Sequence, residues 1–169
     1  MVKKYELTDE TITHFGRTLH RIKAVRDFGD VRSGDIGGYV EGEENLSHFG
    51  DAWVYGDARV YGDAWVYGDA RVYGNARVSG DAWVYGDAWV YGDAVVTRTP
   101  KVLVGFPHIV TITDHHIAAG CEMHPPSVWS ERGAAIIRAD GHRPGEAREW
   151  AAIINAIARA HGCTDREAR

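Results

Sequence analysis

Hydrophobic and polar positions repeat along the middle of the chain in blocks of six residues. Eight consecutive blocks run from Gly50 to Val96, each reading Gly, then Asp or Asn, Ala, a variable residue and Val, followed by Tyr, Ser or Thr. Glycine, alanine and valine keep their places in every block. A fixed period of six residues predicts a parallel β-helix, in which each block is a short strand and a corner.

The spacing of alanine and valine predicts the interior of this helix. The two residues lie at positions i and i+2, so on a strand both side chains point to the same side. The variable residue and the residue after valine point the other way. Glycine supplies a backbone conformation that is costly for other residues, and Asp or Asn stabilises the turn. Three blocks close a triangular coil of about 18 residues, and coils stack about 4.8 Å apart.

Stacking residue i+18 on residue i predicts three outward rows of side chains. The first row is Trp53, Arg71 and Trp89, beside Tyr55, Tyr73 and Tyr91. The second is Arg59, Arg77 and Val95, beside Tyr61, Ser79 and Thr97. The third is Trp65 and Trp83, extended by Lys101, beside Tyr67, Tyr85 and Leu103.

Outward aromatic side chains at this density need an explanation, because soluble monomers rarely expose a large continuous apolar patch. The rings and guanidinium groups can stack on one another, and a neighbouring chain can cover a face, for which a closed three-fold assembly suits a triangular prism. The same rows can also bind a planar anionic ligand, since aromatic rings stack on bases and arginine pairs with phosphate. The candidate ligand-binding residues are Trp53, Arg59, Arg71, Arg77, Trp89 and Tyr73.

The flanking segments predict caps on the repeats. Residues 5–8 and 18–25 are expected to form strands, and residues 36–40 and 45–48 are degraded repeats that place Leu46 at the alanine position and His48, facing inward, at the valine position. Residues 102–104 are expected to finish the last coil. Strands over 108–113 and 116–119 and two helices, which begin near Pro126 and Pro144, complete the chain. The expected domains are an N-terminal β cap (1–35), the repeat helix (36–104) and a C-terminal hairpin and two-helix cap (105–169).

Composition excludes several classes of protein. A net charge of −5 argues against a general nucleic-acid binder, and no run of apolar residues is long enough to span a membrane. The start of the chain lacks the apolar run of a signal peptide, and two cysteines are too few for a disulfide framework. These features favour a cytoplasmic protein with reduced thiols.

Candidate metal and catalytic residues are sparse. His115, Cys121 and His124 have side chains that bind zinc, but their spacing fits no strong zinc template, so neither a metal nor a cofactor is expected. His48 is the lone histidine between His20 and His108, and its inward phase favours a structural role over that of a base.

The chain resembles the hexapeptide-repeat proteins of phages and prophages, which are often labelled acetyltransferases. The resemblance rests on residues 19–31, 34–41 and 45–47, on the repeats, and on residues 111–114, Ile117, Gly120, Cys121, His124 and Trp129. It implies a left-handed helix, a trimer and a phage or prophage source. The expected fold is therefore all-β with a small α cap, a left-handed parallel β-helix of hexapeptide repeats.

Two enzyme families share the hexapeptide-repeat helix, and the residues that each activity requires can be looked for in this sequence. Hexapeptide acyltransferases carry a catalytic histidine on a coil or on an inserted loop, and γ-class carbonic anhydrases hold zinc with three histidines. Residues 50–96 contain no histidine and no inserted loop. We therefore expect a non-catalytic, trimeric binding protein. The phage source implied by the resemblance leads us to expect that it acts in the cytoplasm of a bacterial host and antagonises a host defence there, by sequestering a nucleotide-type signal or blocking a host defence protein. The alternatives are an acyltransferase that uses acetyl-CoA with His48 or a C-terminal histidine, and a structural or accessory trimer of the phage.

Overall fold

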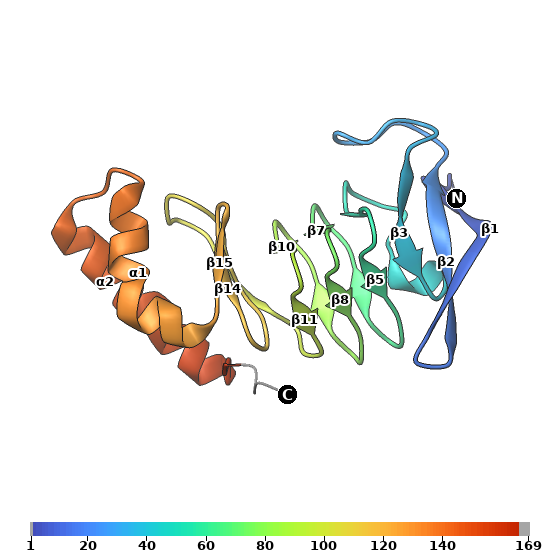
Figure 1. Ribbon diagram of the computed structural model, residues 1–169. Helices are drawn as coiled ribbons and strands as arrows, with labels where there is room; N and C mark the ends of the chain where they lie inside the picture. Colours follow the sequence, from blue (N-terminus) through green and yellow to red (C-terminus); the bar gives the residue numbers. More distant parts are fainter. Residues whose placement is uncertain (1, 166–169) are drawn as a thin grey trace. The chain divides into compact units, whose positions relative to one another are not determined.

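The repeats fold into a β-solenoid of about three turns, and a small sheet with two helices follows it (Figure 1). The computed structural model describes residues 2–165. The chain divides into two compact units, residues 1–100 and residues 101–169. No helix within the described residues is both long and apolar enough to cross a membrane.

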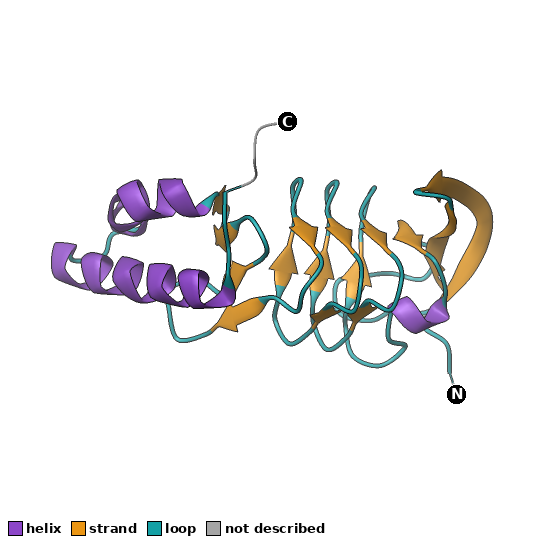
Figure 2. Cartoon of the chain, turned by 90° about the horizontal axis from the view of Figure 1, so that it is seen from below, coloured by secondary structure: helices purple, strands orange, loops and turns teal. Residues whose placement is uncertain are grey.

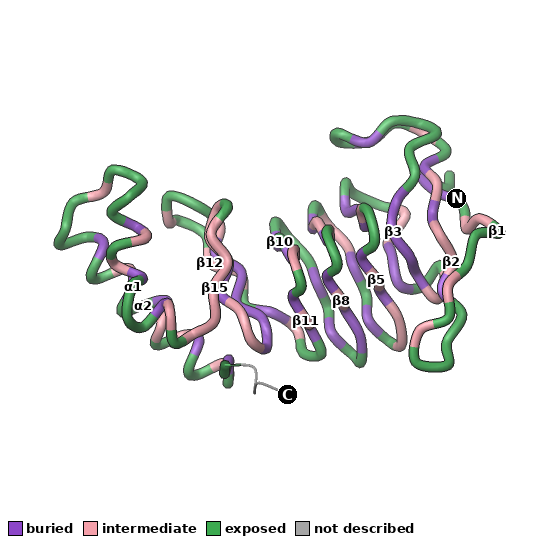
Figure 3. Tube along the Cα trace, viewed as in Figure 1, coloured by how far each residue is buried: buried purple, intermediate pink, exposed green. Residues whose placement is uncertain are grey.

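Each block contributes a two-residue strand formed by its variable residue and its valine. The alanine and valine of every block are at most 1% exposed, as the spacing predicts. Figure 3 shows this alternation as buried and exposed stretches along the coils. The strands are β4 (Trp53–Val54), β5 (Arg59–Val60), β6 (Trp65–Val66), β7 (Arg71–Val72), β8 (Arg77–Val78), β9 (Trp83–Val84), β10 (Trp89–Val90) and β11 (Val95–Val96).

Strands that lie eighteen residues apart pair in parallel and form three faces (Figure 2). The first face is β4–β7–β10, the second continues through β5–β8–β11, and the third is β6–β9. The register aligns Trp53 with Arg71 and Trp89, Arg59 with Arg77, and Trp65 with Trp83. The three predicted rows are thereby confirmed over these residues.

The N-terminal segment closes the open end of the solenoid. Strand β1 (Tyr5–His14) pairs antiparallel with β2 (Arg17–Ala24), which pairs antiparallel with β3 (Ile36–Val40). Strand β3 then pairs in parallel with β5, so the second face extends into a six-stranded sheet. The first two strands are longer or shifted relative to the predicted ranges 5–8 and 18–25, because they form a hairpin around Phe15 and Gly16.

The backbone carbonyls of the first complete coil have no preceding coil to donate hydrogen bonds to them. On each face a different group donates in its place. On the second face the Tyr39 N–H donates to Ala58 O at 2.9 Å. On the third face the Asn45 side-chain amide, at the end of the 3-10 helix η1 (Glu43–Asn45), donates to Gly62 O and Ala64 O, both at 2.9 Å. On the first face the fully buried ammonium of Lys4 donates to Ala52 O at 2.7 Å and to Gly50 O at 3.2 Å.

The predicted phase of the degraded repeat is wrong by two residues. Leu46, rather than His48, lies in register with Val66, whereas Trp53 already follows the regular offset to Arg71. Two additional residues therefore lie in the corner between Leu46 and Trp53. His48 is in this corner instead of pointing into the valine column.

The second unit is an antiparallel sheet with two helices. Its strands are β12 (Lys101–Leu103), β13 (Val110–Ile112), β14 (Ile117–Ala119) and β15 (Glu122–His124), and its helices are α1 (Pro126–Ala139) and α2 (Pro144–His161). The predicted hairpin and both helix starts are confirmed, and Gly162 ends α2 in a left-handed conformation. Because β12 pairs antiparallel with β13, Lys101 and Leu103 do not extend the third row of the solenoid as expected.

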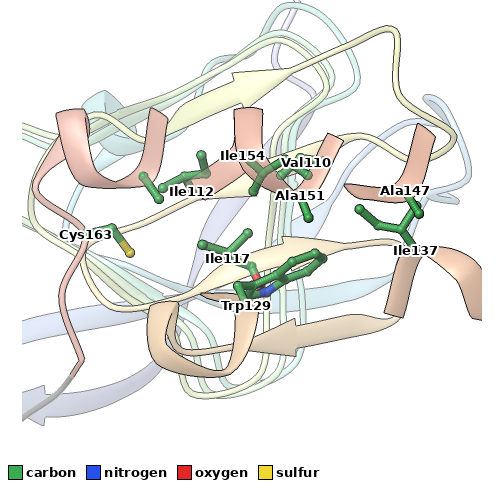
Figure 4. Packing of buried hydrophobic residues seen from close by; sticks show 10 residues of the cluster. Val110, Ile112, Ile117, Trp129, Ile137, Ala147, Ala151, Ile154 and Cys163 are labelled. Carbon is green, nitrogen blue, oxygen red and sulfur yellow. The ribbon is translucent and has the colours of Figure 1, made fainter. Parts of the chain in front are cut away.

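The core of this unit forms between the sheet and the helices (Figure 4). Ile112 and Ile117 contribute from the sheet, and Trp129 and Ile154 from the helices. The indole nitrogen of Trp129 donates to Ile117 O at 2.8 Å, which satisfies its one polar group within the core.

Candidate functional site

A cleft on the first face brings together three of the six predicted site residues. It is an open hollow lined by Asp30, Tyr55, Arg71, Tyr73 and Trp89. Strands β7 and β10 carry Arg71 and Trp89, and Tyr55 and Tyr73 take the next outward position after the valines of β4 and β7. Four of the five lining residues therefore come from the outward positions of successive coils, which the repeat spacing determines, and the fifth, Asp30, lies outside the repeats.

Asp30 holds the arginine in place from the connection between β2 and β3. Arg71 Nη1 donates to Asp30 Oδ2 at 3.0 Å, and the Tyr55 hydroxyl donates to Asp30 Oδ1 at 3.0 Å. A bridge between Phe28 and Val31 closes the turn that presents Asp30. Within residues 2–165 Arg71 makes no other hydrogen bond, so its remaining N–H groups are free for a ligand.

The electrostatics of the cleft keep Asp30 ionised and Tyr55 neutral. Partial burial opposes ionisation of Asp30, but the hydrogen bonds from Tyr55, its own backbone and Arg71 together lower its pKa. Burial, with the neighbouring Asp30 carboxylate, raises the pKa of Tyr55 to about 12. The carboxylate therefore acts as a fixed anion that orients Arg71.

The aromatic side chains of the cleft leave ring surface open. The guanidinium carbon of Arg71 is 5.8 Å from the Trp89 ring, and the indole of Trp89 is 39% exposed. Tyr73 stacks on Tyr91 with their centroids 5.1 Å apart and their planes 11° from parallel. This arrangement offers flat apolar surface next to a charged donor, which suits a planar polar molecule.

Trp53 belongs to the same row but is not available to a ligand. It is 1% exposed and packs edge-on against Phe28, with the centroids 5.3 Å apart, and against Tyr5. The N-terminal segment covers this end of the row. Trp53 is therefore part of the core, and its expected place in an open ligand surface is wrong.

Arg59 and Arg77 lie on another face. They pair with each other across β5 and β8 and do not line the cleft. His14 lies close to both, and its pKa is lowered by partial burial and then by the two positive charges. The structure thus separates this arginine pair from Arg71.

Two cleft residues were not among the predicted site residues. Tyr55 was assigned to the first row, where its repeat position provided the signal. Asp30 lies in an irregular, glycine-containing turn without periodicity, so no sequence pattern places it over the first face.

The cysteine and histidine residues of the second unit do not assemble into a metal site. No group of three or more metal-binding side chains occurs among the described residues. His115 Nδ1 lies 2.9 Å from Thr164 O, and His124 Nε2 lies 2.6 Å from Glu122 Oε2. Cys121 is exposed and forms no disulfide bond.

His48 is held by the N-terminal cap. Its ring stacks on Tyr5 with centroids 4.3 Å apart, and its Nδ1 accepts a hydrogen bond from the Lys4 N–H at 3.3 Å. Partial burial lowers the pKa of His48, although Glu43 opposes this effect. These contacts give His48 a structural role at the corner.

The fold and the site define a β-solenoid repeat protein with an aromatic and arginine-lined cleft. The family model of the YdcK β-solenoid repeat matches residues 52–68 and 70–86, which lie within the stacked coils. No curated protein matches the chain.

Proposed function

We propose that this chain is a non-catalytic binding protein whose cleft on the first face takes a planar, anionic ligand of the nucleotide type. The observation that carries the proposal is Arg71, which Asp30 holds beside the exposed ring of Trp89. A nucleobase would stack on Trp89 or Tyr73, and a phosphate would accept hydrogen bonds from the free guanidinium N–H groups. Stacking of a base on an aromatic side chain contributes about 1–3 kcal/mol.

The lining of the cleft supports binding over catalysis. Its five residues include neither a histidine nor a cysteine. The carboxylate of Asp30 is engaged by two donors, and its pKa is lowered, so it is a weak proton acceptor. A protein of this kind would hold a ligand without converting it.

Assembly and biological role form part of the same proposal. The resemblance to phage and prophage hexapeptide-repeat proteins supports a left-handed solenoid, a homotrimer and action in the cytoplasm of a bacterial host. In that setting the protein would antagonise a host defence by sequestering a nucleotide-type signal, or by blocking a host defence protein.

Calorimetry with nucleotides tests the ligand. Purified protein is titrated with AMP, GMP, CMP and UMP, with a cyclic dinucleotide, and with acetyl-CoA. We expect heat with at least one nucleotide and binding at least tenfold weaker in Arg71→Ala and Trp89→Ala. Arg71→Lys should also weaken binding, because a lysine keeps the charge but loses the planar fork of donors.

Arg17→Ala is the matched control. Arg17 is also an arginine of the first unit bonded to a carboxylate, that of Glu41, but it lies outside the cleft. Its variant should bind as the wild type does. The proposal is refuted if no nucleotide binds, or if Arg71→Ala binds as tightly as Arg17→Ala. Turnover of acetyl-CoA would favour the acyltransferase alternative.

A further inference from the structure

The three outward rows of the solenoid differ in how they combine arginine and tryptophan. In the first row Arg71 lies between two tryptophans of the same chain and contacts Trp89. The other two rows separate the residue types. We call Arg59 and Arg77 the arginine row and Trp65 and Trp83 the indole row. Neither row pairs tryptophan with arginine along its own column.

The indole row is an exposed aromatic surface. Trp65 is 37% exposed, Trp83 is 50% exposed and the neighbouring Tyr85 is 44% exposed. The two indoles meet edge to face with their centroids 6.0 Å apart, and Tyr67 stacks on Tyr85. Large apolar side chains that adjoin one another on a face indicate an interaction surface.

The arginine row consists of two half-buried arginines that form no ion pair within residues 2–165. The Nε atom of Arg59 is buried without a hydrogen-bond partner among these residues. His14, which lies near both, adds no negative charge. A guanidinium group in this setting gains from a partner that supplies aromatic faces.

The two rows have the same spacing. Arg59 aligns with Arg77, and Trp65 with Trp83, each across one step of the stack. Two copies with parallel axes can therefore bring both arginines onto both indoles at once. A two-fold pair in which the indole row meets the same row of a second copy would bring indole onto indole and leave the arginines without an aromatic partner.

We propose that the arginine row of one copy packs on the indole row of a second copy whose axis runs parallel. Such a contact uses two different surfaces of the same chain, so it continues from copy to copy until a ring closes. This inference rests on the self-association proposed above, with three copies in the ring, but it does not depend on the ligand.

Complementation between two variants tests the contact. Arg59→Ala/Arg77→Ala removes one surface, and Trp65→Ala/Trp83→Ala removes the other. Native mass spectrometry is run on each variant alone and on the mixture, at a concentration at which the wild type is fully assembled. We expect a wild-type trimer, monomers of each variant alone, and a dimer with one chain of each kind in the mixture.

Other outcomes would overturn the proposal. An indole contact between identical faces predicts that the arginine variant assembles normally and that mixing rescues nothing. A wild-type monomer, or variants that remain monomers after mixing, would equally refute it. Trp89→Ala, an exposed indole on the first face, is the matched control and should assemble like the wild type.

A charge exchange covers the case in which truncation disturbs folding. Arg59→Glu/Arg77→Glu is mixed with Trp65→Lys/Trp83→Lys, and circular dichroism verifies that each is folded. A mixed oligomer that contains both chains is expected, because the glutamates face the lysines and the retained arginines face the retained indoles. Its absence with both chains folded refutes the contact. A wild-type trimer that binds no nucleotide would instead count against the proposed ligand and leave the contact between copies untouched.

Discussion

Replacing Lys4 by methionine should remove most of the pH dependence of stability between pH 8 and pH 10. Lys4 is completely buried, and its ammonium group donates to two backbone carbonyls at the open end of the first face. Those carbonyls would otherwise accept hydrogen bonds from a preceding coil. The ammonium also lies 4.8 Å from the centre of the Phe28 ring. A buried charge therefore takes the place of the missing strand.

The pKa of Lys4 gives the direction and size of the effect. Burial lowers it from 10.5 to about 8, and the nearby Asp51 only partly offsets the loss of hydration. Above pH 8 the folded chain releases this proton while the unfolded chain keeps it up to about pH 10.5. Unfolding then takes up a proton, so the free energy of unfolding rises with pH. The slope approaches about 1.4 kcal/mol per pH unit only after Lys4 has lost most of its proton, and at pH 8 the group is about half protonated. The gain from pH 8 to pH 10 is therefore about 2 kcal/mol.

Urea unfolding followed by tryptophan fluorescence, at fixed protein concentration, measures this gain. The quantity of interest is the difference between the wild type and Lys4→Met at each pH. Tyr5 and Tyr55 have raised pKa values and are present in both proteins, so their contributions cancel. Lys3→Met, which removes an exposed lysine paired with Glu43, should keep the wild-type dependence. Parallel curves for the wild type and Lys4→Met would refute the reasoning.

Three further changes test the packing by the same unfolding measurements. Val72→Ala should lower the free energy of unfolding by about 2 kcal/mol, because it opens a void in the buried column. Val95→Ala, at an outward position, should lower it by less than about 0.5 kcal/mol. Equal losses would contradict the assigned faces. Gly74→Ala should lower the free energy of unfolding by about 2 kcal/mol, since φ of Gly74 is +72° and the new methyl group would lie 3.0 Å from a backbone nitrogen of the next coil. A neutral effect would contradict this backbone conformation at the corner. Trp129→Phe should destabilise the second unit by about 2–3 kcal/mol, measured by hydrogen exchange, because Ile117 O loses its donor in a dry core; wild-type protection would contradict the hydrogen bond.

The solenoid could be predicted because its information is local and repeated. A side-chain period of two within a block of six determines which residues are buried, and identical blocks must stack in one register. The degraded repeat lacked this redundancy. Two extra residues around His48 shift the phase, and only the partner strand, through the alignment of Leu46 with Val66, reveals the shift. The role of Lys4 depends on a chain reversal that no period encodes.

In the candidate site, too, the residues within the repeats were predictable and those contributed by the irregular connection were not. Arg71, Tyr73 and Trp89 follow from the stacking arithmetic, which brings side chains of successive coils together. Asp30 and the burial of Trp53 depend on where the irregular connection between β2 and β3 lies. The sequence of that connection predicts a turn but not the face that it covers.

The outward positions of a solenoid can change with little effect on its fold, because they do not contribute to the alanine and valine column. Folding of the solenoid therefore does not explain large outward side chains such as Arg71 and Trp83, whose ordering costs conformational entropy. On the first face, Asp30 and the cap already satisfy the arginine and cover one indole, which leaves a hollow suited to a ligand. On the other two faces, the arginines and the indoles lack partners of the complementary type among residues 2–165. A ligand on the first face and a second copy on the other two would give each of these side chains a partner, and substitutions on one set of faces should leave the function of the other intact.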